Sequence, residues 1–373
     1  MELGSMLVKV PESLVTFPHG AEIVVYNYLT RDAITCAPAD IYWLTVAPKW
    51  TAIEDIVEAH PHIESQSLRN EIQSLVGAGM LLESGTPAAE MEAKFEESWE
   101  LGRAAALFHF TALDNEFATP GASIQKQKER ALVDPSPELF SRNSSTAIAL
   151  PCIYSSKTEH LFDVMMKRRT NRRAKQDAIS LQHLSECLYS GLGITGFVKT
   201  ETGLLPLKMT PSGGARNPFE AYVWVQRVDG LNPGIYHYSA LEHSLEVLES
   251  KTNQSPSQLL GGQDWTNDMP AIVFLMAELR RTTWKYNDPN AYRVVLIEAG
   301  HIAQNMMLTC TNNNLTACPT AALCHSKVSA LLGLENITQT PIYALAIGKP
   351  DSNTDDIIDI KDIRDKKSSH RPH

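Results

Sequence analysis

The sequence lacks long apolar runs and an excess of basic residues. No stretch of its 373 residues approaches the roughly 18 apolar residues that span a bilayer, and its start has no basic segment followed by an apolar run and a cleavage site. We therefore expect neither a membrane-spanning helix nor secretion. The 33 Lys and Arg and 43 Asp and Glu give a formal net charge of -10. This balance argues against general nucleic-acid binding, which needs a net basic surface.

Cysteine motifs are also missing. The six cysteines form no Cys-x-x-Cys pair and no Cys/His spacing that suits a tetrahedral zinc site. The sequence also contains no Gly-x-Gly-x-x-Gly turn for a dinucleotide and no internal repeat. These absences predict a protein of a reducing, cytoplasmic compartment that binds no metal.

The composition is that of a globular protein large enough for two domains. Hydrophobic residues make up 43% of the chain and charged residues 20%, so it can build a core that buries a cofactor. The pattern along the chain predicts four segments. They are a small winged-helix-like domain at 7–83, a helix with a linker or covering segment at 84–157, a second domain at 158–350 and a polar tail at 351–373.

The first half of the chain mixes short strands and helices. Residues 22–28 predict a strand, and apolar spacing near 3.6 residues predicts two helices, one around Ile53 and one around Leu68. Residues 88–110 are typical of a single helix. Residues 111–151 lose this periodicity and gain Pro, Ser, Asn and Gly, which predicts a linker or a covering loop.

The second domain combines several strands with one long helix. Strands are predicted at residues 221–226, 234–238, 271–276 and 342–347, the first two joined as a hairpin. The longest helix begins after Pro289 and runs to about Asn312, with a broad apolar face that must be buried. Because strands and helices do not alternate as regular βαβ units, we predict an α+β fold with a mainly antiparallel sheet.

A cluster of cations follows the helix that opens the second domain. It reads Lys167-Arg168-Arg169-Thr170-Asn171-Arg172-Arg173, with five cations and a hydroxyl in seven residues. Guanidinium groups bind phosphate through paired N–H donors, so the cluster is a candidate phosphate site. A solvated charged face or a nucleic-acid patch accounts for the same composition.

A loop with paired glycines precedes the first strand of the second domain. It reads Thr210-Pro211-Ser212-Gly213-Gly214-Ala215-Arg216-Asn217-Pro218. Paired glycines let backbone amides approach a flat or anionic ligand closely. An ordinary loop is the alternative interpretation.

A lysine and a tyrosine stand side by side just before the long helix, in Trp284-Lys285-Tyr286. Two groups whose ordinary pKa is high serve as a base only if their surroundings lower the pKa of one of them. The alternative is an exposed surface pair with no role in chemistry.

Taken in order, these segments resemble the SagB-type dehydrogenases of the nitroreductase superfamily, which modify ribosomally made peptides. The arginine cluster stands at the family's Arg-Arg-Ser-x-Arg motif, and residues 211–218 match its Pro-Ser-(Ala/Gly)-Gly-x-x-x-Pro loop. Residues 230–238 match its Gly-Leu-x-Pro-Gly-(Leu/Ile)-Tyr-His-Tyr hairpin, and Trp284-Lys285-Tyr286, Ala291-Tyr292-Arg293 and Ala299-Gly300-His301 follow in the family's order. The resemblance covers residues 158–350.

The resemblance implies a nitroreductase-like fold that binds FMN. The FMN phosphate and ring edge would contact Arg168, Arg169, Thr170 and Arg172, while the isoalloxazine would lie on the backbone of Pro211, Ser212, Gly213, Gly214 and Ala215. Residues 319–322 would cover its other side, with Ala321 beside it and an amide near Ala322 at flavin N5. Lys361 and Arg364 would add to the phosphate site. Arg216-Asn217 and Ala321-Ala322 depart from the family's usual residues, which leaves only backbone contacts to expect there.

The resemblance also implies an activity and partners. Lys285 and Tyr286 would transfer protons while azoline rings of a precursor peptide are oxidised to azoles, with FMN accepting the hydride and dioxygen reoxidising it. The chain would form a homodimer with each FMN site between two subunits, and a cyclodehydratase could be a partner. Residues 7–83 would bind a leader peptide or extend the dimer interface.

Two other functions fit the same sequence. One is a flavin-dependent reductase of dehydroalanine or dehydrobutyrine in a modified peptide. The other, of a different class, is a flavin-less peptide-binding scaffold for a cyclodehydratase.

Several further residues have an ordinary structural interpretation. His301 is expected to be a core or interface histidine, Cys318 and Cys324 to be small buried hydrophobes, and Trp265, Trp284 and Tyr292 to be packing residues.

Overall fold

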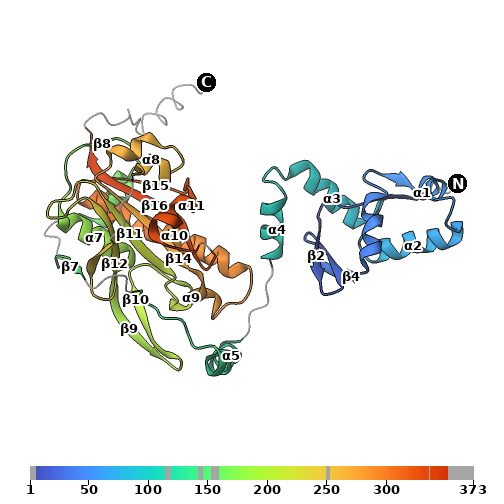
Figure 1. The fold of residues 1–373 in the computed structure, drawn as a ribbon, viewed down its shortest axis with the longest axis horizontal. Helices are drawn as coiled ribbons and strands as arrows, with labels where there is room; N and C mark the ends of the chain where they lie inside the picture. The colour runs from blue at the N-terminus through green and yellow to red at the C-terminus, as the bar shows by residue number, and fades with distance from the viewer. Residues whose placement is uncertain are drawn as a thin grey trace, which may run out of the picture. The chain divides into compact units, whose positions relative to one another are not determined.

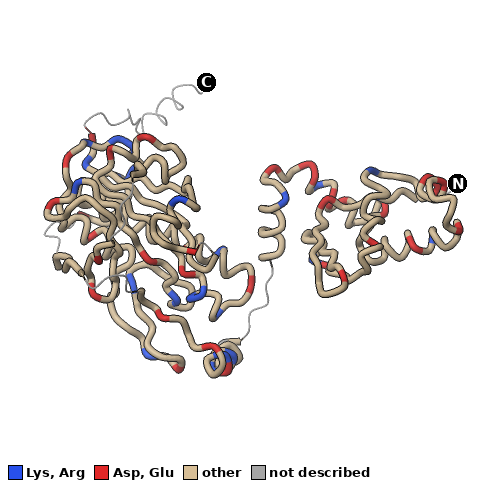
Figure 2. The backbone as a smooth tube through the Cα atoms, viewed as in Figure 1, with Lys and Arg blue, Asp and Glu red and all other residues tan. Residues whose placement is uncertain are grey.

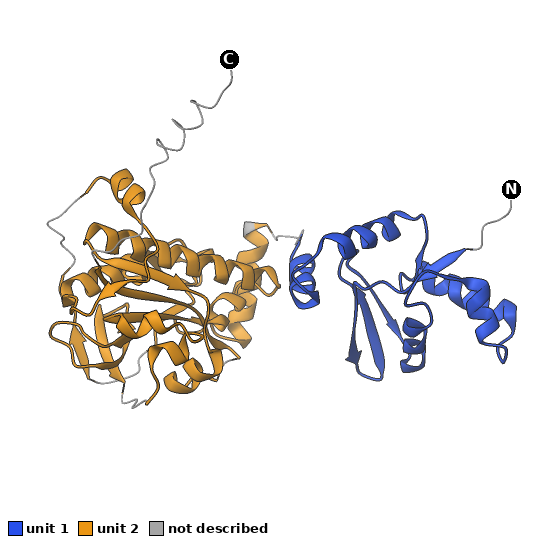
Figure 3. Ribbon diagram, turned by 90° about the horizontal axis from the view of Figure 1, so that it is seen from above, with its two compact units in different colours: residues 1–116 blue, residues 117–373 orange. Residues whose placement is uncertain are grey.

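The computed structural model describes residues 6–113, 119–141, 146–152, 159–248, 253–335 and 337–351. The chain divides into two compact units, residues 1–116 and 117–373, which Figure 3 draws in separate colours. The limits predicted at residues 83, 157 and 350 stay predictions. Lys361, Arg364 and most of the predicted tail lie outside the described residues. No helix in the described ranges is long and apolar enough to cross a membrane.

The first unit contains two three-stranded antiparallel sheets and short helices (Figure 1). Its strands are β1 (Leu7–Lys9), β2 (Leu14–His19), β3 (Glu22–Asn27), β4 (Asp32–Cys36), β5 (Thr51–Ala52) and β6 (Leu82–Glu83). Its helices are η1 (Pro38–Thr45), α1 (Ile53–Ala59), α2 (Ser65–Gly77), α3 (Pro87–Ser98) and α4 (Arg103–Thr111). Ile56 of α1 and Leu68 and Ile72 of α2 are buried in its core, as their 3.6-residue spacing predicts. A small additional domain therefore precedes the second unit.

The prediction of one helix at residues 88–110 is wrong. The chain leaves α3 at Trp99, whose φ of -93° and ψ of 103° are extended, and Gly102 has a φ of 80° in the left-handed region. The indole of Trp99 donates to the carbonyl of Gly102 at 2.9 Å, which closes the turn. Glycine reaches this conformation without steric cost, so α4 begins as a separate helix.

The second unit is built on one antiparallel sheet of eight strands among the described residues. The order is β15-β16-β14-β11-β12-β13-β7, and β8 pairs with β16. The strands are β7 (Ala147–Ala149), β8 (Ala174–Lys175), β11 (Phe219–Val225), β12 (Gly234–Ser239), β13 (Ser244–Leu248), β14 (Ala271–Glu278), β15 (Thr316–Thr320) and β16 (Gln339–Pro350). A separate hairpin joins β9 (Ile194–Thr200) to β10 (Gly203–Lys208). The predicted α+β class, the antiparallel sheet and the β11–β12 hairpin are confirmed.

Helices cover both faces of this sheet. They are α6 (Leu161–Lys167), α7 (Leu181–Leu192), η2 (Gly213–Ala215), α8 (Pro256–Leu259), η3 (Asp264–Asp268), α9 (Leu279–Thr283), α10 (Asn290–Asn312) and α11 (His325–Leu332). The long helix α10 has the predicted bounds, and its core-facing side chains pack with α7 on one face of the sheet. Leu259 of α8 and Val328 of α11 pack on the other face.

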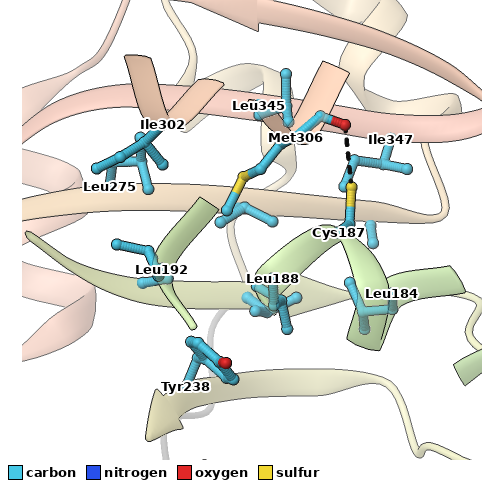
Figure 4. Packing of buried hydrophobic residues seen from close by; sticks show 14 of the residues in the cluster. Leu184, Cys187, Leu188, Leu192, Tyr238, Leu275, Ile302, Met306, Leu345 and Ile347 are labelled. Atoms are coloured by element: carbon cyan, nitrogen blue, oxygen red, sulfur yellow. Dashed lines mark hydrogen bonds between the residues drawn. The ribbon is translucent and has the colours of Figure 1, made fainter. Parts of the chain in front are cut away.

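Side chains alternate between the two faces, as the two-residue period of a strand requires. In β14, Val273 and Leu275 belong to the core under α7 and α10, whereas Ile272 and Phe274 belong to the core on the opposite face. Figure 4 shows the first of these cores, where Leu188 of α7 is fully buried. Truncation of such a residue to alanine typically costs about 2–5 kcal/mol, so this core fixes α10 on the sheet.

The prediction of a linker or covering loop at residues 111–151 is wrong in part. Residues 120–133 form α5 (Pro120–Val133), whose N-cap residue Thr119 accepts a hydrogen bond from the amide of Ala122 at 3.4 Å. Proline at the first position of a helix is pre-organised for the helical φ. The Thr-Pro pair was therefore a helix-start signal inside a segment whose composition is that of a loop.

Candidate functional site

The arginine cluster is fastened to the start of β15. It follows the end of α6, and Thr170 forms a parallel bridge with Ala317. The amide of Asn171 donates to the carbonyl of Ala317 at 3.4 Å, and the hydroxyl of Thr316 donates to the carbonyl of Asn171 at 3.3 Å. The backbone of the cluster therefore has a fixed place at one end of the sheet.

Two guanidinium groups of this cluster are available for an anion. Arg168 is half-buried and Arg172 exposed, and neither has a carboxylate partner within the described part of the chain. The guanidinium of Arg172 lies 6.0 Å from the ring centre of Trp265, which orients it without neutralising its charge. In Figure 2, Lys and Arg positions are interspersed with Asp and Glu along both units, so this cationic cluster is a local feature of an acidic chain.

Two other cations of the cluster are engaged locally. Lys167 pairs with Glu159 at 2.7 Å, and this hydrogen bond raises the pKa of the lysine. Arg169 is exposed, and its Nη1 donates to the carbonyl oxygens of Met166 at 2.6 Å and Arg168 at 2.8 Å at the end of α6. Of the arginines predicted to bind the phosphate, Arg168 and Arg172 thus have the side chains that are most available for an anion.

The residues predicted to cover the flavin follow β15. Ala321 and Ala322 are exposed, and the amide of Ala322 donates to the hydroxyl of Thr320 at 3.1 Å. That hydroxyl also accepts from Gln263 Nε2 at 2.9 Å. The amide expected at flavin N5 therefore has an internal acceptor. We call residues 168–173 the arginine end of the sheet. Residues 319–322 lie between the two ends, because Thr320 is in register, through Ala344 of β16, with Phe274 in the middle of β14.

The glycine loop has a strained backbone. Gly214, Ala215 and Asn217 have φ angles of 61°, 54° and 47°. Non-glycine residues adopt this region at a cost, and such strain persists only where the surroundings hold it. Here the hydroxyl of Ser212 accepts from the amide of Asn217 at 2.8 Å, and the side chain of Asn217 donates to the carbonyl of Pro206 at 3.2 Å.

The glycine loop lies directly against the lysine-tyrosine pair. A Cβ atom added to Gly214 would lie 2.5 Å from Tyr286 Oη and 2.7 Å from Lys285 Nζ. A Cβ added to Gly213 would lie 2.7 Å from Cγ1 of Val294 on α10. Lys285 Nζ is 5.2 Å from the ring centre of Tyr286, and both residues are half-buried. The fold thus brings together two motifs that are far apart in the sequence, so closely that a methyl group at Gly214 would force the ends of both side chains to shift.

Glu298 anchors the same loop from α10. It is 5% exposed and accepts hydrogen bonds from the side chain of Ser212 and the amide of Gly213. Burial raises the pKa of Glu298 to about 7, although these hydrogen bonds and the charge of Lys208 oppose the shift. Burial also lowers the pKa of Lys208 to about 8.

Sequence reasoning assigned no role to Glu298. Its position in the sequence could have indicated a buried carboxylate, because Glu298 lies on the apolar face of α10 between buried Val295 and Ile302. A carboxylate on such a face must find partners when it is buried. We call residues 211–217 with Lys285, Tyr286 and Glu298 the glycine end of the sheet.

A buried charge network lies behind the glycine end. Arg281 of α9 donates to Glu220 Oε1 of β11 at 2.5 Å, and His237 lies 3.0 Å from both Glu220 and Glu246. Burial alone would raise the pKa of Glu220, but the hydrogen bond from His237 and the charges of Arg281 and His237 lower it to about 2. Glu220 therefore stays ionised at neutral pH, and its bond to Arg281 holds α9 on the sheet.

The two ends are separated within one chain. Ala317, which pairs with Thr170, lies through β16 in register with Ala271 at the start of β14. The carbonyl of Pro218 accepts from the amide of Glu278 at the finish of β14. The seven residue steps from Ala271 to Glu278, at about 3.3 Å each, correspond to about 23 Å. The arginine cluster and the glycine loop of one chain are thus at opposite ends of the sheet.

The other residues that the sequence analysis singled out differ in their burial. His301 is exposed, so a core role is wrong: it lies on the side of α10 away from the sheet core. Trp284 is 2% exposed and is a packing residue as predicted, while Tyr292 is 41% exposed. Cys318 is buried and Cys324 half-buried. Across the described residues, no group of His, Cys, Asp or Glu is placed to hold a metal ion.

Comparisons with known proteins identify the second unit. The nitroreductase family model matches residues 165–349. The nitroreductase-like protein MJ1384 of Methanocaldococcus jannaschii is 30% identical over 203 residues, which are 54% of this chain and 96% of MJ1384. The trifolitoxin-processing protein TfxB of Rhizobium leguminosarum bv. trifolii is 27% identical over 157 residues, 40% of this chain and 41% of TfxB.

One solved structure is similar to part of the chain. A nitroreductase-like protein of Ralstonia eutropha JMP134 is 23% identical and has a TM-score of 0.46, with 57% of this chain and 93% of that one covered. The match to MJ1384 decides the family, because it spans nearly the whole of that protein at 30% identity. The chain belongs to the nitroreductase family.

Proposed function

We propose that this protein is an FMN-dependent dehydrogenase that oxidises azoline rings to azoles in a ribosomally made precursor peptide. The observation that carries the proposal is the packing of Lys285 Nζ and Tyr286 Oη against Gly214. This packing supports a proton-transfer role for both side chains, because the family resemblance puts the flavin ring on the same loop. The similarity to TfxB, named for trifolitoxin processing, supports a peptide as the substrate.

The residues present fit a flavin mononucleotide. Arg168 and Arg172 provide guanidinium groups without a carboxylate partner among the described residues, which suits one phosphate. The absence of a Gly-x-Gly-x-x-Gly turn from the sequence favours FMN over a dinucleotide. Residues 212–215 would then support the ring through their backbone, since a side chain at Gly213 or Gly214 would collide with the protein itself.

The proposed chemistry divides between the cofactor and the chain. When bound, FMN accepts the hydride from the β-carbon of the azoline, and dioxygen is the final oxidant. Lys285 and Tyr286 take the acidic proton from the α-carbon, so that the ring gains one double bond and loses two hydrogens. The glycine loop fixes where the reacting carbon lies relative to both groups.

We further propose that each site is completed by two copies of the chain. Since about 23 Å of sheet separates the two ends, the arginine end of one protomer would meet the glycine end of its partner. Exposed apolar side chains supply a surface for this contact on α6 and α10. They are Leu161, Phe162, Met165 and Met166 on α6 and Leu296 and Ile297 on α10.

The first unit would recognise the leader segment of the precursor. This part of the proposal is based on its winged-helix-like sequence pattern and on the peptide-modifying relatives. A cyclodehydratase that forms the azoline ring is the enzyme expected to act before this one.

Mass spectrometry of a ring-containing peptide tests the proposal. Purified protein should remove about 2 Da per ring in the presence of dioxygen, because oxidation takes two hydrogens. A gain of about 2 Da on a dehydroalanine peptide, dependent on NADPH, would instead establish the reductase. Protein without flavin absorbance near ~450 nm, when isolated and after incubation with FMN, would leave only the scaffold function.

A further inference from the structure

The segment at residues 130–141, which begins in the last turn of α5, lies along α9 and the residue after it. Its first residue, Arg130, donates from Nη1 to the carbonyl of Thr283 at 3.1 Å and to that of Trp284 at 2.8 Å. These are the last carbonyl of α9 and the carbonyl of its C-cap. The final carbonyls of a helix have no partner inside the helix, so Arg130 supplies their hydrogen bonds from a distant part of the chain.

Arg130 is itself held in one orientation. Asp134 Oδ2 accepts from Nε at 3.2 Å and from Nη2 at 3.0 Å, and Oδ1 of the same carboxylate accepts from Arg280 at 3.1 Å. The indole of Trp284 donates to the carbonyl of Asp134 at 2.8 Å. Both the backbone and the side chain of Trp284 are therefore bound to the 130–141 segment.

Two buried arginines fasten the rest of the segment. Arg216 donates to the hydroxyl of Ser136 at 2.7 Å and lies 5.0 Å from the ring centre of Trp284. Arg281 donates to the carbonyl of Glu138 at 2.9 Å. A fluctuating linker would not have such a set of hydrogen-bond partners. Because Arg216 belongs to the glycine loop, its hydrogen bond to Ser136 joins the 130–141 segment to that loop.

We propose that Arg130 is a positioning residue for Lys285 and Tyr286. It binds the carbonyl oxygen of Trp284, which belongs to the peptide group that links Trp284 to Lys285. The side chains of Lys285 and Tyr286 therefore stay against Gly214. Its effect on turnover rests on the proposed function, whereas its effect on the geometry does not. The 130–141 segment is then part of the site and not a tether between domains.

Native-state proteolysis tests the geometry without any cofactor or substrate. Trypsin cleaves after lysine and arginine, so cleavage after Lys285, identified by the mass of its fragments, reports local opening of this turn. Arg130→Ala should accelerate cleavage at Lys285 by about tenfold or more, because it removes both carbonyl contacts and the link to Asp134. Lys126→Ala, an exposed cation on the same helix, is the matched control and should leave the rate unchanged.

Kinetics then separate positioning from general support. Arg130→Ala should lower kcat for peptide oxidation by about tenfold or more, with KM and flavin occupancy unchanged and the pH profile displaced. Arg130→Lys keeps the charge but not the paired donors, so it should restore only part of the rate. If the wild-type protein oxidises no azoline, the proposed function is wrong. The proteolysis result still decides whether Arg130 positions Lys285 and Tyr286, because it needs no substrate.

If Arg130→Ala does not fold, Asp134→Asn replaces it in the proteolysis test. Asp134→Asn weakens the hold on Arg130 without removing the guanidinium, and should give a smaller acceleration at Lys285. Unchanged cleavage at Lys285 in Arg130→Ala, or in Asp134→Asn where that is the soluble variant, would overturn the proposal. Equal acceleration at every tryptic site would also overturn it, because that is general destabilisation.

Discussion

The two ends of the sheet differ in the burial of their charged groups. The arginine end carries exposed cations, whereas the glycine end lies against buried charged groups and its loop packs tightly against neighbouring side chains. Arg168 and Arg172 have no carboxylate partner among the described residues, whereas Arg281 is 2% exposed and bonded to Glu220. A methyl group at Gly214 would collide with two side chains. The same residue type therefore has two environments: Arg168 and Arg172 are accessible to an anion, whereas Arg216 and Arg281 are buried and hold the surrounding backbone.

The contrast has an energetic basis. A buried charge that loses its partner is strongly destabilising, typically by about 3–5 kcal/mol, so Arg281, which lies behind the glycine end, belongs to the fold. An exposed arginine costs the fold little when removed, so the arginine end can be altered without unfolding the protein. We therefore expect substitutions at the two ends to fail in different ways.

The largest expected effect is on turnover at the glycine end. Lys285→Ala and Tyr286→Phe should each lose about 10²–10⁴-fold in peptide oxidation, because positioned proton-transfer groups contribute that much. Flavin occupancy, read from absorbance, should stay that of the wild type. Near-normal oxidation in both variants would remove this pair from the chemistry.

At the arginine end, the main loss should be in cofactor affinity. The Arg168→Ala, Arg172→Ala double variant should bind FMN about 10²-fold more weakly, since a hydrogen bond to a charged group contributes about 1.5–3 kcal/mol. Fluorescence titration measures the Kd, with Lys327→Ala as a control for removing an exposed cation. A double variant with wild-type affinity would show that the phosphate binds elsewhere.

The packing at the glycine end predicts a smaller effect on stability. Gly214 and Gly230 both have positive φ, 61° and 83°, but only a Cβ at Gly214 meets other atoms. Gly214→Ala should therefore lower the free energy of unfolding by about 1–3 kcal/mol more than Gly230→Ala does. Denaturant titration compares the two variants, and equal losses would contradict the close approach.

The smallest expected effect is a pH dependence from Glu298. Burial raises its pKa in the folded protein to about 7 from an ordinary value of 4.5. Between these values the folded state keeps a proton that the unfolded state has lost, so its contribution to stability falls as pH rises, by at most about 1.4 kcal/mol per pH unit. Glu298→Gln should remove this fall in denaturant titrations from pH 4.5 to 7, while Glu242→Gln on the surface should keep it.

Much of the fold could be predicted from local patterns. The apolar spacing of α10 reflects burial of one helix face against one core, and the continuous apolar run of β14 reflects burial between two cores, one on each face of the sheet. The helix α5 was missed because its surface is polar, and its start signal, Thr119 with Pro120, lay in a segment rich in loop residues. Residues 88–110 were assigned to one helix because the sequence does not show that Gly102 adopts a left-handed φ.

The candidate site was less predictable than the fold. Its motifs could be recognised one by one, but the contact of Gly214 with Lys285 and Tyr286 depends on how β11, α9 and α10 meet. Glu298 and Arg130 were missed for the same reason. Their partners are backbone or side-chain groups far away in the sequence, which no local spacing indicates.

Hybrid dimers test the central claim, that the arginine end of one protomer and the glycine end of its partner form one site. Two inactive chains, one with Arg168→Ala and Arg172→Ala and the other with Lys285→Ala, are given different affinity tags, co-expressed and isolated as mixed dimers. One of their two sites then has both defects and the other has none, so peptide oxidation should return to about half of the wild-type rate per dimer. Mixed dimers as inactive as the two parents would contradict the account, because each site would then be built from a single chain.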